Sequence, residues 1–351
     1  MPHRAAQYRL GPFLLTCEVP LPELEALAVA VEAGTGMAFA RSSNVGEYDV
    51  SIRLGRVPER IADVVANESR WWASRDEYLL RVPEVGNFLV RHGREVLVEP
   101  APGAPPANIR AYLLSPIFSA LCHQAGMYSL HASAVGVGAG VVAFLGNSGA
   151  GKSTLAAGLA QRGYTILADD ICLLDTRPGA VDADPGPALV VPVAPALKLW
   201  RSALEQLGAS SEALPRVFSG NDKFRIPVPQ AVELPQRLPL REVLFLEWAD
   251  EDATSQPGAD DPGATRDRTA DDSSAQPALA PVAGVNAVAR LMEFTHYDYL
   301  MKATGRQTGN FLLCGRILRH ARAFVLRRPR DFAHFDRTLD ALEDHLAAIG
   351  K

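Results

Sequence analysis

Residues 141–170 read VVAFLGNSGAGKSTLAAGLAQRGYTILADD, and the order of patterns within them sets the expected architecture. A buried apolar run, Val141–Leu145, leads into the glycine-rich segment Gly146–Ser153, and a helical pattern covers Lys152–Gln161. After a turn, Tyr164–Ala168 has the apolar composition of a second buried strand. This order of strand, glycine-rich loop, helix and strand predicts an α/β domain whose first loop lies at the start of a helix.

The segment Gly146–Ser153 matches the phosphate-loop pattern G-x-x-x-x-G-K-[ST]. Glycines let backbone N–H groups turn toward phosphate oxygens, and the following helix adds unpaired N–H groups and the positive end of its dipole. Lys152 supplies charge to the β- and γ-phosphates, and the Ser153 hydroxyl can bind Mg²⁺. The pattern predicts that ATP and Mg²⁺ bind here; the competing interpretation is a glycine turn before an unrelated helix. The expected nucleotide-binding residues are Gly146, Asn147, Ser148, Gly149, Ala150, Gly151, Lys152, Ser153 and Thr154.

Two adjacent carboxylates, Asp169 and Asp170, end the returning strand. The helix runs about 15 Å away from the loop and the strand returns about 16 Å, so the pair should lie at the phosphate edge. In an extended strand the two side chains point to opposite faces, which predicts different roles. One would hold Mg²⁺, and the other would accept the proton of an attacking hydroxyl. The alternative is a helix cap or a loop turn.

His131 lies in the segment Ser129–Val135, which precedes the glycine-rich turn Gly136–Gly140. If the segments on either side of this turn pair antiparallel, His131 lies opposite Leu145 or Gly146, at the mouth of the phosphate loop. An imidazole there could orient or polarise one of the aspartates. The alternative is a hydrogen-bonded histidine within a core strand.

Three cations outside the loop, Lys198, Lys223 and Arg225, are candidates for the site because a transferring phosphoryl group needs positive charge around its oxygens. Lys223 and Arg225 lie in a polar stretch typical of a site loop, and the alternative for both is a solvated surface charge. Lys198 is equally compatible with a helix residue whose stem covers apolar surface beside Trp200. The run Arg327–Arg330 could bind an anionic partner, although such runs are more often solvated turns.

The whole chain predicts two domains. A stretch rich in proline and alanine, Glu99–Ala107, separates a smaller N-terminal domain of mixed α and β structure, residues 1–108, from the phosphate-loop domain, residues 109–351. Residues 251–284 have almost no large apolar side chain and are expected to form a mobile or disordered insert. Strands are expected at Tyr48–Leu54, Glu77–Val82, Asn87–Val98 (two strands turning at His92-Gly93), Glu242–Leu246 and Ala323–Leu326, and helices at Ile109–Gly126, Val285–Phe294, Thr308–Arg322 and Phe332–Ile349.

Composition narrows the classes of function. The 351-residue chain has a formal net charge of -5, so it lacks the basic surplus of a general nucleic-acid binder. Its four cysteines have no metal-ligand or redox spacing and are expected to be buried thiols. The sequence shows neither a signal-peptide pattern nor a membrane-spanning run, so we expect a cytoplasmic protein with no membrane partner.

The run from His131 to Asp170 resembles the HPr kinase/phosphorylase family. In that family a histidine precedes the phosphate loop by this interval, and an Arg-Gly pair, here Arg162-Gly163, precedes a strand that ends in two aspartates. The resemblance implies that Asp169 is the base toward the acceptor hydroxyl and that His131 supports Asp169. It also implies that Asp170 lies near the metal ion, with Ser153 as a ligand.

Most of the chain is more similar to HPr-kinase-like proteins encoded with lasso-peptide biosynthesis genes. The similar segments are residues 130–135 (LHASAV), Pro195–Trp200 (PALKLW) and Asp222-Lys223-Phe224. This resemblance implies a kinase for a terminal serine of a lasso-peptide precursor. Thr154 stands where HPr kinases have an acidic residue, and their glycine-rich C-terminal signature is not found, so HPr is not the implied substrate.

Together these patterns predict an α/β fold with an HPr-kinase-like, PEP-carboxykinase-like phosphate-loop core and a mixed sheet. The leading hypothesis is an ATP- and Mg²⁺-dependent kinase for a serine of a precursor peptide, with an N-terminal domain that recognises the peptide or forms a homo-oligomer. The alternatives are a small-molecule kinase or carboxykinase-like enzyme, and a non-catalytic nucleotide-dependent switch. The catalytic candidates are Asp169, His131, Lys152, Lys223 and Arg225, and the metal candidates are Ser153 and Asp170.

Overall fold

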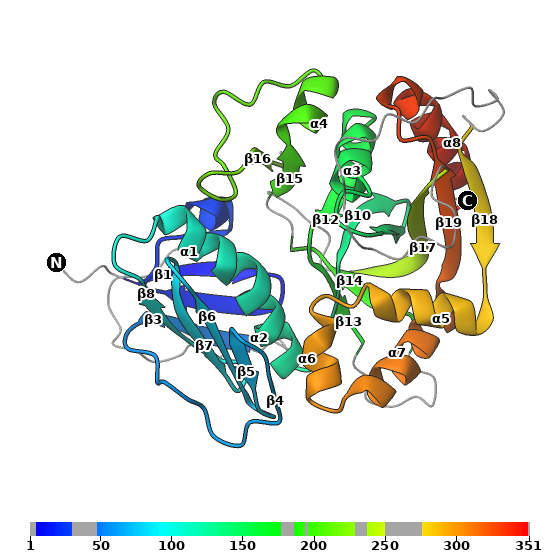
Figure 1. Cartoon of the computed structure of the whole chain (residues 1–351). Helices are drawn as coiled ribbons and strands as arrows, with labels where there is room; N and C mark the ends of the chain where they lie inside the picture. Colours follow the sequence, from blue (N-terminus) through cyan, green and yellow to red (C-terminus); the bar gives the residue numbers. More distant parts are fainter. Residues whose placement is uncertain are drawn as a thin grey trace.

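The computed structural model describes residues 5–29, 48–176, 186–193, 196–228, 237–249 and 276–349. These residues form an eight-stranded sheet, a nine-stranded sheet and a two-stranded sheet with helices packed on them (Figure 1). Both larger sheets contain parallel and antiparallel strand pairs. The expected mixed α/β class is therefore confirmed.

The eight-stranded sheet is mostly antiparallel, with order β1-β2-β3-β8-β7-β6-β5-β4. The predicted strands Tyr48–Leu54 and Glu77–Val82 are confirmed. Asn87–Val98 forms two strands that turn at His92-Gly93, where both residues have positive φ angles. The strands are β1 (Ala6–Leu10), β2 (Phe13–Cys17), β3 (Tyr48–Leu54), β4 (Ala66–Asn67), β5 (Trp71–Ala73), β6 (Glu77–Val82), β7 (Gly86–Arg91) and β8 (Glu95–Pro100).

One helical segment links the two larger sheets and confirms the helix predicted at Ile109–Gly126, with a slightly earlier start. Its middle is a single π-helical turn that contains Pro116, whose missing N–H would interrupt an ordinary α-helical ladder. Leu113, Ile117 and Leu121 belong to the core of the N-terminal sheet. The parts are α1 (Pro106–Tyr112), η2 (Leu113–Ile117) and α2 (Phe118–Gln124).

The nine-stranded sheet carries the phosphate loop. Its order is β12-β10-β11-β17-β14-β13-β9, and β19 pairs with β17 and with β18. Because β11, β17 and β19 run parallel, their carboxyl ends lie at one edge, which is where ligands bind in open α/β sheets. The strands are β9 (Tyr128–Leu130), β10 (Ala132–Val137), β11 (Gly140–Leu145), β12 (Thr165–Ala168), β13 (Cys172–Asp175), β14 (Leu189–Val191), β17 (Leu238–Trp248), β18 (Ala278–Val282) and β19 (Arg322–Arg328).

Helices cover both faces of this sheet (Figure 1). On one face, Leu155 of α3 and Leu339 of α8 share a buried cluster with Phe144 of β11. On the other, Leu291 of α5 and Ile317 of α7 belong to a second cluster. The sheet is thus the middle layer of three, and α3 holds the phosphate loop at its N-terminus. The helices are α3 (Lys152–Gln161), α5 (Gly284–Glu293), α6 (Asp298–Ala303), α7 (Gln307–His320) and α8 (Phe335–Ala347).

The expectation for residues 251–284 is partly wrong. Residues 251–275 lie outside the described residues, but Ala278–Val282 form β18, which pairs antiparallel with β19, and α5 begins at Gly284. The strand lies at the sheet edge, where few large apolar side chains are needed and where Pro281 is tolerated. Its composition therefore resembles that of a loop.

A separate hairpin comes from residues 196–227. β15 pairs antiparallel with β16, which places Lys198 opposite Arg225 and Trp200 opposite Lys223. Lys198 therefore lies on a strand, and its interpretation as a helix residue is wrong. Leu199 packs in the same buried cluster as α3, which fixes the hairpin beside the phosphate loop. The elements are β15 (Ala196–Trp200), α4 (Arg201–Gln206) and β16 (Lys223–Pro227).

The N-terminal sheet packs directly on the nine-stranded sheet. Leu173 of β13 and Val191 of β14 belong to the same buried cluster as Phe13 of β2. The hydroxyls of Tyr78 on β6 and Tyr299 on α6 lie 2.8 Å apart and form a hydrogen bond across this contact. The two sheets thus share one apolar core.

All four cysteines are buried and free, as predicted. Burial raises the pKa of the Cys17 and Cys172 thiols to about 12, which keeps them protonated and unreactive. Within the described ranges, no helix combines the length and the apolar character that crossing a bilayer requires.

Candidate functional site

The phosphate loop joins β11 to α3. Lys152 begins the helix directly after Gly151, whose φ of 78° lies in the left-handed region. Gly149 also has a positive φ, and a Cβ there would meet no atom within 4 Å, so its backbone borders open space. These two glycines let the chain curl in front of the helix N-terminus, where unpaired N–H groups favour an anion.

The Lys152 side chain folds back over its own loop. Its residue exposure is 7%, and Nζ donates hydrogen bonds to the carbonyl oxygens of Gly146 (2.7 Å) and Asn147 (3.2 Å). Burial lowers the pKa of Lys152 to about 8, against the attraction of Asp169 and Asp170. A buried ammonium that is held mainly by neutral carbonyls is stabilised when an anion binds.

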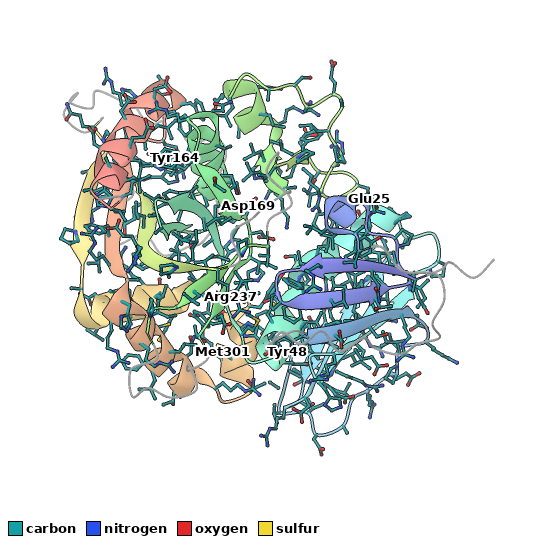
Figure 2. All side chains as sticks on the ribbon, turned by 180° about the vertical axis from the view of Figure 1, so that it is seen from behind. Glu25, Tyr48, Tyr164, Asp169, Arg237 and Met301 are labelled. Carbon is teal, nitrogen blue, oxygen red and sulfur yellow. The ribbon has the colours of Figure 1, made fainter. Side chains whose placement is uncertain are left out.

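Asp169 lies beside this loop because of the strand order. β12 pairs with β10, and β10 pairs with β11, so β11 and β12 end at the same edge. Oδ1 of Asp169 accepts hydrogen bonds from the hydroxyls of Ser153 (2.7 Å) and Ser133 (2.6 Å). Oδ2 accepts the backbone N–H of Lys198 (2.7 Å). In Figure 2, Asp169 lies on the side of the larger sheet that faces the N-terminal sheet.

Asp170 has a different set of partners. Its Oδ2 accepts hydrogen bonds from Lys198 Nζ (2.6 Å) and from the hydroxyl of Ser115 in the π-helical turn (3.1 Å), and His131 Nδ1 lies 3.4 Å from Oδ1. Burial raises the pKa of Asp170, but the Lys198 ammonium and His131 outweigh it, so this pKa lies well below its ordinary value. Asp170 is therefore held as an anion.

The expected pairing of partners with the two aspartates is wrong. Ser153 contacts Asp169 rather than Asp170, and His131 contacts Asp170 rather than Asp169. The side chains do not alternate across the sheet because β12 ends at Ala168 and Asp170 adopts a φ of 72°. The chain turns between the two aspartates, so both carboxylates stay on the loop side of the sheet edge.

The predicted position of His131 is confirmed. The register pairs Ala132 with Leu145, so His131 precedes the ladder opposite Gly146. His131 interrupts the expected strand Ser129–Val135, because its backbone N–H donates to the Phe294 carbonyl (2.8 Å) instead of continuing the ladder. The imidazole is therefore fixed at the mouth of the loop.

A second candidate cation position lies next to His131. Ligand atoms of His131, Asp170 and His296 lie within 4.8 Å of one another, and the two imidazoles stack at 5.5 Å. Burial lowers the pKa of His296 to about 3, and its Nδ1 has no hydrogen-bond partner within the described residues. Neutral imidazole and carboxylate suit a divalent transition metal, whereas the Ser153–Asp169 pair offers oxygens that suit Mg²⁺.

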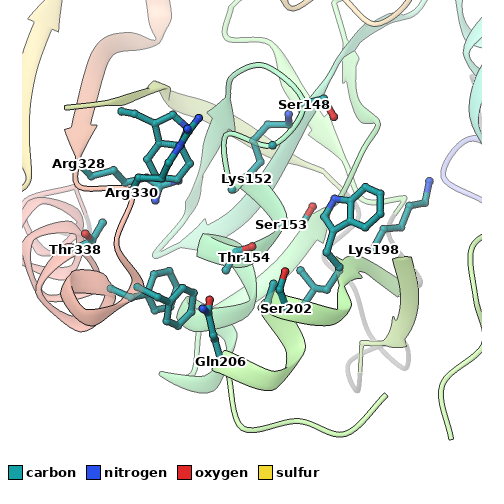
Figure 3. Close-up of a pocket in the computed structure, with 18 of the residues that line it drawn as sticks. Ser148, Lys152, Ser153, Thr154, Lys198, Ser202, Gln206, Arg328, Arg330 and Thr338 are labelled. Carbon is teal, nitrogen blue, oxygen red and sulfur yellow. The ribbon is translucent and has the colours of Figure 1, made fainter. Parts of the chain in front are cut away.

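The loop and the aspartates open into one cavity of about 530 Å³, within the usual range for ligand sites (Figure 3). Lys198 and Lys223 line it, and the Lys223 ammonium lies 5.8 Å from the centre of the Trp200 ring. Arg225 does not line it: its buried guanidinium is near Glu23 and Arg110, and burial lowers its pKa. Of the predicted loop residues, the lining includes Ser148, Gly149, Gly151, Lys152, Ser153 and Thr154.

Sequence reasoning missed four side chains of the site. Ser133 gave one usable signal, because it is the single hydroxyl in the otherwise small and apolar strand Ala132–Val137. Ser115, His296 and Trp248 gave none, since each comes from an element far away in the sequence that the fold brings to the loop.

The residues present fit a nucleoside triphosphate and Mg²⁺. The loop backbone borders open space at Gly149, and Ser153 meets Asp169 at the cavity wall. The Lys152 ammonium is buried, and its bonded partners in the described part of the chain are backbone carbonyls. Anionic phosphates would take the place of the carbonyl partners of Lys152, and the hydroxyl and carboxylate oxygens of Ser153 and Asp169 are of the kind that would hold an oxygen-binding cation.

Neither protein-family models nor curated proteins gave a match to this sequence. Among solved structures, the HPr(Ser) kinase/phosphatase from Coxiella burnetii is similar, with 14% sequence identity and a TM-score of 0.27. The similarity covers 63% of this chain and 92% of that chain.

Proposed function

We propose that this chain is a kinase that transfers the γ-phosphoryl group of ATP, with Mg²⁺, to a serine hydroxyl of a peptide. The observation that carries the proposal is the hydrogen bond between Ser153 and Asp169, which joins a phosphate-binding loop to a carboxylate at the wall of one cavity. A phosphate-binding element and a nearby proton acceptor are what a hydroxyl kinase requires.

The loop would hold the triphosphate. Lys152 would turn its ammonium from the loop carbonyls to the β- and γ-phosphates, and Lys198 and Lys223 add positive charge at the cavity wall. The Ser153 hydroxyl would hold Mg²⁺, which neutralises charge on the phosphate oxygens when bound, and the Asp169 carboxylate beside it stays available as a base. Fixed positive charge around the transferring group stabilises its oxygens while the bond to the leaving oxygen breaks.

Asp169 is the proposed acceptor of the serine proton. It already accepts hydrogen bonds from two hydroxyls, those of Ser133 and Ser153, as it must from an acceptor serine. Asp170 is not suited to this role, because its pKa lies well below the ordinary value and protonation would disrupt its ion pair with Lys198. Asp170 would instead keep Lys198 and its strand at the site.

The proposed acceptor is the C-terminal serine of a lasso-peptide precursor. This choice follows from the resemblance of residues 130–135 and of Asp222-Lys223-Phe224 to kinases encoded with such peptides. The position of Lys223 on the cavity wall is compatible with that choice, because an ammonium there can pair with a terminal carboxylate. The N-terminal sheet, whose linking helix brings Ser115 to Asp170, is proposed to contact the peptide.

The test is incubation of the protein with ATP, Mg²⁺ and the precursor peptide, followed by mass spectrometry. The peptide should gain a phosphate on its terminal serine, and a peptide with alanine at that position should not. Asp169→Asn should slow transfer by at least about 100-fold, the usual contribution of a general base, while ATP still binds in calorimetry.

Three results would change the assignment. Transfer at the wild-type rate in Asp169→Asn would show that Asp169 is not the base. ATP consumption with small hydroxyl compounds but not with the peptide would support the small-molecule kinase. ATP binding without transfer to any acceptor would support a nucleotide-dependent switch.

A further inference from the structure

The cavity has a second half, on the side of the phosphate loop away from the aspartates. In the sheet, β11 separates β10, β12 and Asp169 on one side from β17 and β19 on the other. Because β17 and β19 run parallel to β11, their last residues, Trp248 and Arg328, reach the same edge as the loop. Both side chains and that of Arg330 line the cavity. Figure 3 shows Arg328 and Arg330 across the cavity from Lys198.

Arg328 is held against the loop. Its buried guanidinium donates a hydrogen bond to the Ala150 carbonyl and lies 4.0 Å from the centre of the Trp248 ring. A Cβ on Gly151 would lie 2.5 Å from Arg328 Nη2, so a side chain at that position would displace the arginine. Loop and guanidinium therefore fit together closely.

The second property of Arg328 is that its charge is uncompensated within the part of the chain that the structure describes. Among the described residues no carboxylate pairs with it, its Nε has no hydrogen-bond partner, and burial lowers its pKa to about 10. An uncompensated buried cation is unfavourable in the ligand-free protein and is stabilised when an anion comes close. Its contact with the phosphate loop makes bound phosphate the natural anion.

Beyond Arg328 the wall becomes aromatic. The Arg330 guanidinium lies 5.4 Å from the centre of the Trp248 ring, and the Phe332 and Phe335 rings stack at 4.3 Å with an interplanar angle of 16°. Flat aromatic faces and guanidinium planes are the groups on which nucleobases stack. Gln206 of α4 lines the same cavity and offers an amide to a base or ribose. The aspartate half, in contrast, is lined by Lys198 and Asp169.

We propose that the nucleoside end of the triphosphate binds at Trp248, Arg330 and Phe332, with Arg328 beside the phosphates nearest the nucleoside. The γ-phosphate then points to the opposite half, toward Asp169. This inference rests on the proposed function, because it requires a nucleotide in the phosphate loop. The inference adds to that function a binding subsite for the nucleoside, and it states which way the nucleotide lies along the sheet edge.

The test compares ATP with inorganic tripolyphosphate, which has the three phosphates but no nucleoside. Affinities of both for the full-length protein are measured by calorimetry with Mg²⁺ present. Trp248→Ala should weaken ATP binding roughly 5- to 150-fold, the range found for one base stacked on one aromatic side chain, and should leave tripolyphosphate binding unchanged. Trp248→Phe should retain most of the ATP affinity, because it keeps an aromatic face.

Two further variants separate this subsite from the rest of the site. Lys152→Ala should weaken ATP and tripolyphosphate alike, because it removes a phosphate contact. Trp200→Ala, which removes a half-exposed tryptophan from the hairpin side of the cavity, should change neither affinity. Circular dichroism of each variant checks that the fold is intact.

Failure of the subsite and failure of the proposed function give different results. If wild-type protein binds neither compound, the phosphate loop does not bind nucleotide and both proposals are overturned. If it binds ATP no more tightly than tripolyphosphate, or if Trp248→Ala weakens both equally, only the nucleoside subsite is overturned. An equal loss of ATP affinity in Trp200→Ala would place the base in the other half.

Discussion

In the ligand-free protein, Lys152 lowers stability because its ammonium is buried with backbone carbonyls as its bonded partners. The burial that lowers its pKa to about 8 means that the folded state binds this proton less tightly than the unfolded chain does. Below pH 8 both states carry the charge, and the cost of burying it is fully present. As pH rises from 8 toward the unfolded value, the folded state loses the proton first and the cost disappears.

We therefore predict that Lys152→Met raises the free energy of unfolding at pH 7 by about 1 to 3 kcal/mol, with a smaller gain at pH 10. Methionine keeps much of the apolar stem of the lysine, but the loop carbonyls lose the donor that Lys152 supplies. The gain in the free energy of unfolding is therefore smaller than the free energy that corresponds to the whole pKa shift of Lys152. Urea unfolding of both proteins at the two pH values measures the effect. A variant that is less stable at pH 7, or a gain independent of pH, would contradict this account of Lys152. ATP, which should raise the melting temperature of the wild type, should not raise that of Lys152→Met.

At the scale of elements, Lys198 makes two polar contacts between the hairpin β15–β16 and the larger sheet. The Lys198 backbone N–H bonds to Asp169 and its ammonium to Asp170, so a single strand position contacts both carboxylates. The ammonium and the Asp170 carboxylate are mostly buried, with side-chain exposures of 12% and 19%. Removing one partner of such a pair leaves the other charge buried and uncompensated.

Lys198→Met should thus lower the free energy of unfolding by about 3 kcal/mol at pH 7. The pKa of Asp170 is depressed in the folded state, so its stabilisation is present above the unfolded value and is lost as pH falls toward the folded one. The difference between wild type and variant should accordingly shrink below about pH 4. Urea unfolding of the wild type and of Lys198→Met, at pH 7 and at a pH below 4, measures this difference in the free energy of unfolding.

A double-mutant cycle with Asp170→Asn provides the control for this prediction. If the ion pair is the cause, the double variant should be markedly more stable than the sum of the two single losses implies. Additive losses, or a loss that stays the same from pH 7 to well below pH 4, would assign the effect of Lys198 to packing.

An element could be predicted from the sequence when the residues that determine it are neighbours along the chain. The sequence predicts the strand Val141–Leu145, the phosphate loop and α3 correctly. Their signals, an apolar run, a group of glycines and the first turn of a helix, follow one another directly along the chain. The hairpin was missed because its strands pair across the α4 segment, and β18 because an exposed edge strand needs little apolar surface. The prediction assigned the partners of Asp169 and Asp170 the wrong way round. The cause is the positive φ of Asp170, a backbone conformation that the pattern of side chains does not reveal.

At the scale of the whole molecule, the two larger sheets share buried side chains. Leu173 of β13 is fully buried in the same cluster as Phe13 and Phe88 of the N-terminal sheet. The linking helix adds the Ser115–Asp170 hydrogen bond, so the N-terminal half also contacts the site. If residues 1–108 were an independent domain, the halves would unfold separately; the common core predicts that they unfold together.

Two substitutions in different buried clusters test this cooperativity. Leu173→Ala lies in the core shared with the N-terminal sheet, and Leu159→Ala lies under α8, in a different cluster. Each should lower the free energy of unfolding by about 2 to 5 kcal/mol as a buried large-to-small change.

If unfolding is cooperative, hydrogen exchange measured by mass spectrometry should show that each variant lowers protection equally in β6–β7 and in β11–α3. Loss of protection in β11–α3 alone for Leu159→Ala, with β6–β7 unchanged, would show instead that the N-terminal sheet is stable by itself. In that case the contact at Leu173 is an interface between two domains. The N-terminal half could then move relative to Asp170.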